Sequence, residues 1–492
     1  MKNSIHSSVQ SFAIPQHSHR GLLRSVLVFS LMFTCCGMFA DSNPDSMKAS
    51  LPTKAAVISS YAPDQYMKTV ATLFAGEKFA ELDSMAATAR TNRTRFHGGG
   101  WELHTLYVTI SSPAGSGGND TLNADWQLLE QKLKRWMAQR PDSITPRIAL
   151  AGAYRLSAWQ ARGDGYADLV KDEAWGIFGE RQRLALTVLN DAVLLKEKCP
   201  EWYTLMINTS RDQSWDPSGR KALLEQAIAF EPLYYYNYKD FAFSLQPRWG
   251  GEVGEAEEFA RQIADRIGGK QGQFIYFQIA IELSCTGCAE DKTQFSRLSW
   301  KTIQQGYAAL EEMYGTSPYF LNEFAHLAVR AEDRDVAIKT FLQIGNDWRE
   351  DVWHSRQNFE SSKGWALAPP PEFMEHWAAA MTNFHTPIGR AYQGKIDLEF
   401  EKDVAAAVKA CETGQKSSEG PFGLTLLMGK DGMLEQAKAW PPTSASACLL
   451  SKLNAHRFTA PPSGSYWIVH NVGEVKPPPF HFEAPVIPDV RN

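Results

Sequence analysis

The chain has 492 residues, of which 44% are apolar, 12% aromatic and 21% charged. This composition excludes a disordered tail protein, a collagen-like chain and a coiled-coil rod. The net charge is -5, from 50 Lys and Arg against 55 Asp and Glu. A weakly acidic chain is a poor candidate for binding nucleic acid, because neutralising phosphates takes clustered Lys and Arg.

The N-terminus has the pattern of a secretory signal peptide. Residues 1–40 contain three basic and no acidic residues, and residues 25–40 form an uncharged, largely apolar run. We predict cleavage near Ala40, export to the periplasm and no transmembrane span afterwards, since the run is shorter than the ~20 residues of a spanning helix. An uncleaved run would instead be an N-terminal membrane anchor.

The pattern along the chain divides it into five segments. These are a signal peptide at 1–40, a linker at 41–61, a helical repeat-like region at 62–396, a small α+β domain at 397–475 and a Pro-rich tail at 476–492. The third segment is expected to be helical because period-two runs of β-branched residues are absent and good helix formers dominate.

Paired helices are the main signal in the long segment. Apolar side chains recur at helical spacing from Val253 to Ile267, and Gly268 follows as a stop. Residues 317–345 predict a helical hairpin that turns at Glu332–Asp333.

Prolines mark expected helix starts in the same region. Pro200 and Pro232 are 32 residues apart, and they and Pro318 are followed by aromatic residues. This spacing resembles a tetratricopeptide-type repeat. The predicted fold class is therefore mainly α, a tetratricopeptide-like paired-helix array (an α/α superhelix) with a small C-terminal α+β unit.

The α+β unit is predicted from a change of pattern after the array. Asp431-Gly432 lies between two apolar runs, which favours a β-hairpin. The expected order is α-β-β-α-β, with elements at 397–412, 420–427, 433–440, 444–456 and 465–470. The second helix is predicted to direct inward Ala447, Cys448, Leu450 and Leu453.

Five cysteines remain after the signal peptide, so at least one is free or pairs between chains. They are Cys199, Cys285, Cys288, Cys411 and Cys448. Cys285 and Cys288 form a C-x-x-C without a second such pair or a preceding strand. This disfavours a zinc or thioredoxin-like site and favours a local disulfide or two plain thiols.

Three segments resemble the uncharacterised bacterial family called domain of unknown function 4034. They are Arg95–Leu103 with the letters RFHGGGWEL, Ala158–Gly163 with AWQARG, and Pro247–Gly251 with PRWGG. Each joins Trp or Phe to Gly in an order that other helical repeats lack. The resemblance covers about residues 66–266, implies an all-helical region and brings no activity.

The C-terminal unit is similar to the TonB C-terminal-like domains of envelope proteins. The similarity rests on Lys430–Gly432 in the hairpin, Ala447–Leu449 in the helix and Phe458–Pro462 before the last strand. Some of these domains have one Cys on each helix, so the resemblance implies a disulfide between Cys411 and Cys448.

Three short patterns suggest chemistry, but none is complete. Residues 389–395 match the first part of a phosphate loop, yet Ile396 stands where Ser or Thr must bind magnesium. Glu323 and His326 have the spacing of a di-iron motif, which needs a second copy, so a surface Glu and a packed His are expected. The acidic residues Glu255, Glu257 and Glu258 favour a solvated helix face over a glycosidase pair.

Fifteen Trp residues are a high number for this length. Trp126, Trp136, Trp159 and Trp175 lie within apolar helical stretches, which favours packing between helices, and a carbohydrate-binding platform is the alternative.

These observations favour a non-catalytic protein-interaction scaffold of the bacterial cell envelope, with a protein partner there. We predict no catalytic residue, no metal site and no cofactor. One alternative is an exported α/α-toroid hydrolase of glycans, which the Trp content and acidic residues favour. Another is a self-associating structural protein joined through the odd cysteine. The sequence leaves open the partner's identity, the oligomeric state and whether the helices close into a ring.

Overall fold

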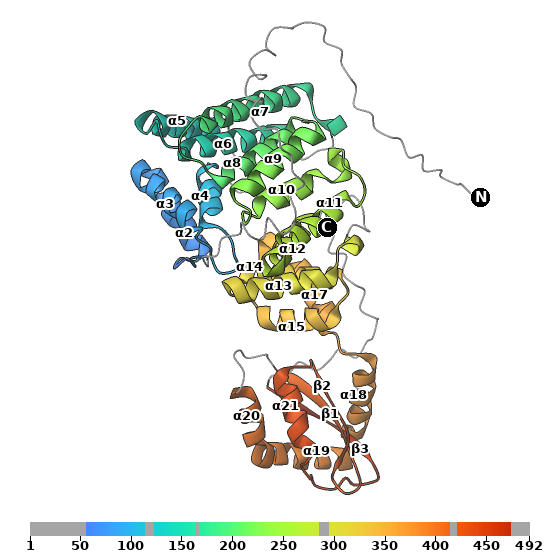
Figure 1. The fold of residues 1–492 in the computed structure, drawn as a ribbon. Coiled ribbons are helices and arrows are strands. Elements are labelled where there is room, and N and C mark those ends of the chain that lie inside the picture. Colours follow the sequence, from blue (N-terminus) through green and yellow to red (C-terminus); the bar gives the residue numbers. More distant parts are fainter. Residues whose placement is uncertain (1–55, 114–122, 164–166, 285–294, 414–420, 474–492) are drawn as a thin grey trace, which may run out of the picture. The chain divides into compact units, whose positions relative to one another are not determined.

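The computed structural model describes residues 56–113, 123–163, 167–284, 295–413 and 421–473. These residues are mostly helical, and a small antiparallel sheet follows the helices in the chain (Figure 1). The predicted fold class is therefore confirmed. The predicted signal peptide, the Pro-rich tail from residue 476, Cys285 and Cys288 lie outside the described residues.

The helical array runs from residue 63 to residue 367. Its helices are α2 (Pro63–Ala75), α3 (Phe79–Asn92), α4 (Glu102–Ile110), α5 (Asn123–Gln139), α6 (Thr145–Arg162), α7 (Asp172–Val193), α8 (Pro200–Asp212), α9 (Pro217–Phe230), α10 (Tyr236–Ser244), α11 (Glu255–Ile267), α12 (Gly269–Leu283), α13 (Trp300–Tyr314), α14 (Pro318–Arg330), α15 (Arg334–Ile344), α16 (Glu350–Trp353) and α17 (Arg356–Leu367).

Neighbouring helices pair in the manner of a repeat array. Extensive contacts join α6 to α7, α11 to α12, α12 to α13 and α14 to α15. A second set of contacts joins alternate helices, α4 to α6, α6 to α8, α8 to α10 and α10 to α12. Each pair therefore buries its apolar side against the next pair, which is how a repeat array is stabilised.

The predicted hairpin at 317–345 is confirmed as α14 and α15. The side chain of Asp333 begins α15 by accepting a hydrogen bond from the backbone of Val336 at 3.1 Å. Pro200 and Pro318 are the first residues of α8 and α14, as predicted. The prediction for Pro232 was wrong, because α10 begins only at Tyr236 and Pro232 lies in the preceding turn.

The glycine-rich loop at residues 95–101 joins parts of the array that are far apart in sequence. The backbone N–H of Gly98 donates to the carbonyl oxygens of Tyr314 at 3.4 Å and Gly315 at 3.2 Å. Gly99 has φ +84, and a Cβ there would lie 2.7 Å from a ring carbon of Tyr314 and 2.9 Å from one of Phe274. Only glycine permits both the backbone conformation and this close approach.

Arg95 holds the same loop in place through contacts of its guanidinium group. Its guanidinium lies 3.7 Å from the centre of the Trp101 ring. It donates to the carbonyl oxygens of Gly99 at 2.9 Å and Leu233 at 3.0 Å. The segment RFHGGGW therefore has a packing role, linking the start of α4 to α10, α13 and α14.

The C-terminal unit combines helices with one sheet. Its elements are α18 (Pro371–Phe384), α19 (Pro387–Glu399), a π-helical turn (Phe400–Val404), α20 (Ala405–Thr413), β1 (Phe422–Met428), β2 (Leu434–Trp440), α21 (Ser444–Leu453) and β3 (Tyr466–Val472). The strand order is β2-β1-β3, and β1 pairs antiparallel with both neighbours. The predicted Asp431-Gly432 hairpin connects β1 and β2.

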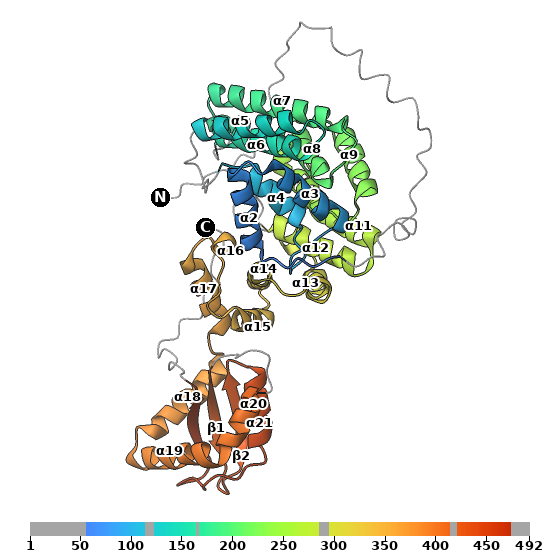
Figure 2. The same ribbon diagram turned by 90° about the vertical axis from the view of Figure 1, so that its left-hand side faces the viewer.

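The sheet separates two layers of helices (Figure 2). Alternate residues of β1, including Leu424 and Leu426, join a core with side chains of α19, α20 and α21. The opposite face meets α18, where a Cβ on Gly423 would lie 3.1 Å from a ring carbon of Trp377. The predicted start of this unit at residue 397 falls inside α19. The unit begins earlier, because α18 also packs on β3.

A disulfide links α20 to α21 in this unit. It joins Cys411 and Cys448, the pair implied by the resemblance, with their Cα atoms 5.7 Å apart. The predicted inward face of α21 needs correction, because Leu449 is buried and Ala447 is exposed. The capping box at Thr443 sets the start of α21 and turns Ala445, Leu449 and Leu453 towards the sheet.

Candidate functional site

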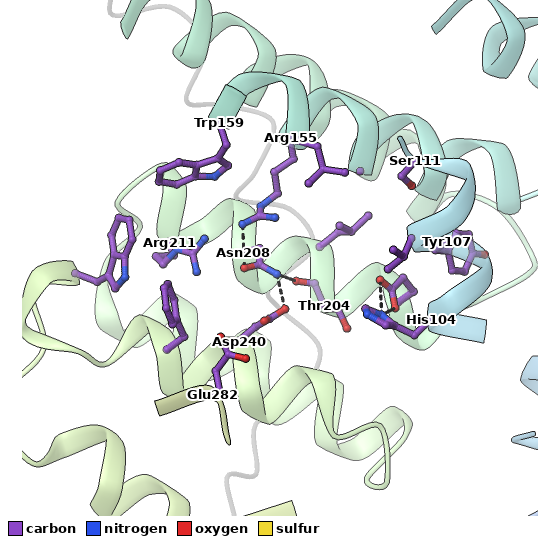
Figure 3. Close-up of a pocket in the computed structure, with 17 residues that line it drawn as sticks. His104, Tyr107, Ser111, Arg155, Trp159, Thr204, Asn208, Arg211, Asp240 and Glu282 are labelled. Carbon is purple, nitrogen blue, oxygen red and sulfur yellow. Dashed lines mark hydrogen bonds and ion pairs between the residues drawn. The ribbon is translucent and has the colours of Figure 1, made fainter. Parts of the chain in front are cut away.

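An open cavity of about 470 Å³ lies among α4, α6, α8, α10 and α12 (Figure 3). We call it the inner cavity. Its walls come mainly from three helices, α4 with His104, Tyr107, Val108 and Ser111, α6 with Gly152, Arg155, Leu156 and Trp159, and α8 with Glu201, Thr204, Leu205, Asn208 and Arg211. Asp240, Phe243, Trp249 and Glu282 complete it.

The residues with which α4, α6 and α8 line the cavity have the same spacing along the chain. Each helix contributes residues at positions i, i+3, i+4 and i+7, which lie along one face of an α-helix. The helices approach closely where Gly152 on α6 meets Ser111 at the end of α4, since a Cβ on Gly152 would lie 2.8 Å from the Ser111 hydroxyl. The alternate helices of the array therefore present one continuous surface to the cavity.

A buried carboxylate holds the polar side chains of α6 and α8 that line one wall of the cavity, the upper wall in Figure 3. Asp212 has no exposed side chain and pairs with Arg155 at 2.9 Å and Arg211 at 2.7 Å. It also accepts hydrogen bonds from Trp159 Nε1 at 2.9 Å and Gln182 Nε2 at 3.0 Å. Burial favours a higher pKa for Asp212, but the two guanidiniums outweigh it and hold its pKa below the ordinary value.

The opposite wall, here called the lower wall, is acidic, because it includes Asp240 of α10 and Glu282 of α12. Asn208 donates from its amide to the carboxylate of Asp240 and accepts a hydrogen bond from Arg155 at 3.2 Å (Figure 3). Burial, helped by the negative charge of Glu282, raises the pKa of Asp240 to about 6. Glu282 itself pairs with Lys239 at 3.3 Å. Although burial lowers it, the negative charges of Glu282 and Asp240 together raise the pKa of Lys239.

The far end of the inner cavity contains a third carboxylate. Glu201 accepts a hydrogen bond from the hydroxyl of Tyr234 at 2.5 Å and lies 3.0 Å from His104 Nδ1. The His104 ring is stacked on Tyr236, with 3.6 Å between ring centres. Both polar side chains are therefore held in fixed orientations.

Glu323 and His326 are both buried. His326 is buried, as predicted, and burial lowers its pKa to about 3. The prediction that Glu323 lies at the surface was wrong, because it is only 8% exposed and burial raises its pKa to about 7. No group of three or more His, Cys, Asp or Glu side chains suited to a metal occurs in the described residues.

The other sequence patterns also have structural explanations. Residues 389–395 lie inside α19, so they do not form a phosphate-binding loop. Glu255 and Glu258 are exposed, as predicted, but Glu257 is buried and lies 3.4 Å from Arg297. Cys199, the free cysteine of the described chain, is 1% exposed and is therefore unavailable to join two chains.

Tryptophans divide between packing and the inner cavity. Trp136 is fully buried, as the packing interpretation predicts. Trp159 and Trp249 line the cavity, with their rings 5.8 Å apart and perpendicular. The packing interpretation is thus incomplete for Trp159, and it was wrong for Trp175, which is 37% exposed.

The sequence did not identify the inner cavity. Its residues occupy a second face of helices whose first face packs in the array, and polar residues on such a face look like ordinary surface residues. The available signal was the shared i, i+3, i+4, i+7 spacing, which becomes meaningful only when the helices are known to be neighbours.

Comparisons of the chain with protein-family models, curated proteins and solved structures found no match. The family resemblances therefore stay predictions, and the site is interpreted from its geometry. Among the described helices, none is both long and apolar enough to cross a membrane.

Proposed function

We propose that this chain is an exported, non-catalytic interaction protein of the bacterial cell envelope. Its inner cavity binds an extended peptide segment of a protein partner. The proposal rests on one observation, the three helical stripes that face a single open cavity with their polar side chains already fixed by one another. A preformed surface of this kind binds a ligand without the entropy cost of ordering its own side chains.

A peptide suits the mixed character of the walls. Val108 and Leu156 line the cavity and are 48% and 38% exposed, so they offer apolar contact area. Trp159, Trp249 and Phe243 add aromatic walls. Fixed polar groups between these apolar surfaces match a peptide, in which apolar side chains alternate with backbone amides.

The binding test uses the purified full chain and a displayed library of octapeptides. Leu156→Arg places a charge on the cavity wall, and Leu128→Arg on α5 is the control, because Leu128 is 62% exposed and does not line the cavity. We expect peptides that bind the wild type and the control and bind Leu156→Arg at least tenfold more weakly. Equal binding by all three proteins contradicts the proposal.

Export is tested separately. A C-terminally tagged chain should be recovered from a periplasmic extract with its N-terminus near Asp41, as the signal-peptide pattern predicts. Recovery of the uncleaved chain from the cytoplasm contradicts this part of the proposal.

A glycan hydrolase is the second candidate. It is favoured by Asp240, whose pKa is raised to about 6 beside Glu282, and by the tryptophans of the same cavity. A screen of polysaccharides and peptidoglycan should then show turnover that Asp240→Asn abolishes. Absence of turnover by the wild type removes this candidate.

A further inference from the structure

In the inner cavity, the arginines are better paired with opposite charges than the carboxylates are. At the upper wall, both guanidiniums are engaged, because Arg155 and Arg211 share Asp212. Arg211 also lies over the rings of Trp249 at 4.9 Å and Phe243 at 5.1 Å. An acidic ligand would have to compete with these contacts.

The carboxylates at the lower wall are less well compensated. Among the described residues, Asp240 accepts a hydrogen bond from the Asn208 amide, and no cation forms an ion pair with it. Glu282 has Lys239 at 3.3 Å, and its side chain is still 27% exposed. Among the described residues, Lys239 is the cation in ion-pair contact with this pair of carboxylates, through Glu282. Arg155 and Arg211 act on Asp240 only from a longer distance and are themselves paired with Asp212, which leaves room for a further cation.

We propose that the inner cavity recognises a basic side chain, Lys or Arg, of its peptide ligand, placed between Asp240 and Glu282. This inference rests on the proposed function and names the chemistry of the peptide. The two carboxylates come from α10 and α12 and both line the open cavity (Figure 3). Leu205 and Phe243 line the same space and offer apolar contact to the aliphatic stem of the basic residue.

The surrounding charges set the pH dependence of this contact. The charged and polar groups that act on Asp240 are Arg155 on α6, Asn208 and Arg211 on α8, Lys239 on α10 and Glu282 on α12. Glu323 on α14 acts in turn through Lys239 and Glu282. Because the pKa of Asp240 is about 6, its carboxylate is mostly ionised at pH 7.5 and mostly protonated at pH 5. A basic ligand is therefore bound more tightly at the higher pH.

The test analyses the peptides that the octapeptide library yields against the full chain. We expect enrichment of Lys or Arg flanked by apolar residues, and replacing that residue by norleucine should weaken binding at least tenfold. Asp240→Asn and Glu282→Gln keep the side-chain shapes and should each weaken basic peptides about tenfold, with Leu128→Arg as the unaffected control.

A pH series separates a charge contact from a purely structural role. Basic peptides should bind the wild type roughly tenfold more weakly at pH 5 than at pH 7.5, and Asp240→Asn should remove this difference. If Asp240→Asn does not fold, Glu282→Gln and the norleucine peptide on the wild type still decide the matter.

Two results overturn the inference. Peptides that need Leu156 but show no preference for Lys or Arg, or that favour Asp or Glu, disprove the charge assignment and leave the proposed function standing. A library that yields no binding peptide disproves both.

Discussion

Ionisable side chains are buried at several points of the array, and each is stabilised differently. Asp212 is ionised because two arginines surround it. Glu323 has no such pair, and its hydrogen bond with Tyr319 and the nearby Lys239 do not offset its burial. A buried carboxyl without a close cation is neutral at pH values where an exposed one is charged.

The first prediction concerns Glu323. Its folded-state pKa is about 7 against an ordinary 4.5, so the unfolded chain releases the proton at lower pH than the folded chain does. Glu323 therefore lowers stability increasingly from pH 4.5 to pH 7, and the cost is complete above pH 7. We expect Glu323→Gln to raise the free energy of unfolding by about 1–3 kcal/mol more at pH 8 than at pH 4.5.

Denaturant unfolding at both pH values measures this difference. Glu312→Gln is the matched control, because the Glu312 side chain is 62% exposed. An effect of Glu323→Gln that is the same at both pH values would show that Glu323 is not neutralised by burial.

At the scale of elements, the C-terminal unit illustrates how a short chain segment is held together. Its core places one face of β1 against α19, α20 and α21, and α18 covers the other face. Small units of this kind gain much of their stability from a covalent link, because their apolar core is limited. The disulfide between Cys411 and Cys448 closes a loop with a sequence separation of 37 residues.

The second prediction follows from that loop. Replacing both cysteines, Cys411→Ser with Cys448→Ser, should destabilise the C-terminal unit by about 2–4 kcal/mol, since the unfolded chain regains the entropy of the open loop. Hydrogen exchange of the β1 amides, Phe422–Met428, in the full chain measures the loss. The wild type under reducing conditions should show the same faster exchange, and unchanged exchange in both would contradict the prediction.

At the scale of the whole array, contacts between distant segments decide its geometry. The loop at 95–101 binds the C-terminal end of α13, more than 200 residues along the chain, through backbone hydrogen bonds from Gly98. It contacts the turn before α10 through Arg95. The inner cavity also depends on long-range packing, because its walls come from helices that are separate in sequence.

The third prediction tests this long-range packing. Gly99→Ala should destabilise the protein by about 1–3 kcal/mol. The backbone at this position is left-handed, and the added Cβ would lie only 2.7 Å from Tyr314 and 2.9 Å from Phe274. Gly364→Ala in α17 is the control and should stabilise the chain by about 0.5–1 kcal/mol, since nothing lies within 4 Å of its added Cβ. Thermal unfolding of both variants measures the contrast, and equal midpoints would refute it.

Local patterns were sufficient to predict the helical hairpin and the β-hairpin. The helical periodicity of residues 317–345 and the Asp431-Gly432 turn are dictated by neighbours in the chain, and both were predicted correctly. The error at Ala447 came from missing the capping box at Thr443, whereas those at Pro232 and Glu323 share another cause. In these two cases, the position depended on which other segment packs nearby, and a local pattern contains no information about that segment.

The sequence by itself determined the paired helices, the hairpin and the class of fold, because periodicity and turn residues act over a few neighbouring positions. Only the tertiary structure decided that stripes from α4, α6 and α8 enclose one cavity, that Asp240 and Glu282 share a wall and that the loop at 95–101 reaches the end of α13. Those features depend on contacts between residues far apart in the chain. Their free energy depends on burial and distance, which exist only once the helices have packed.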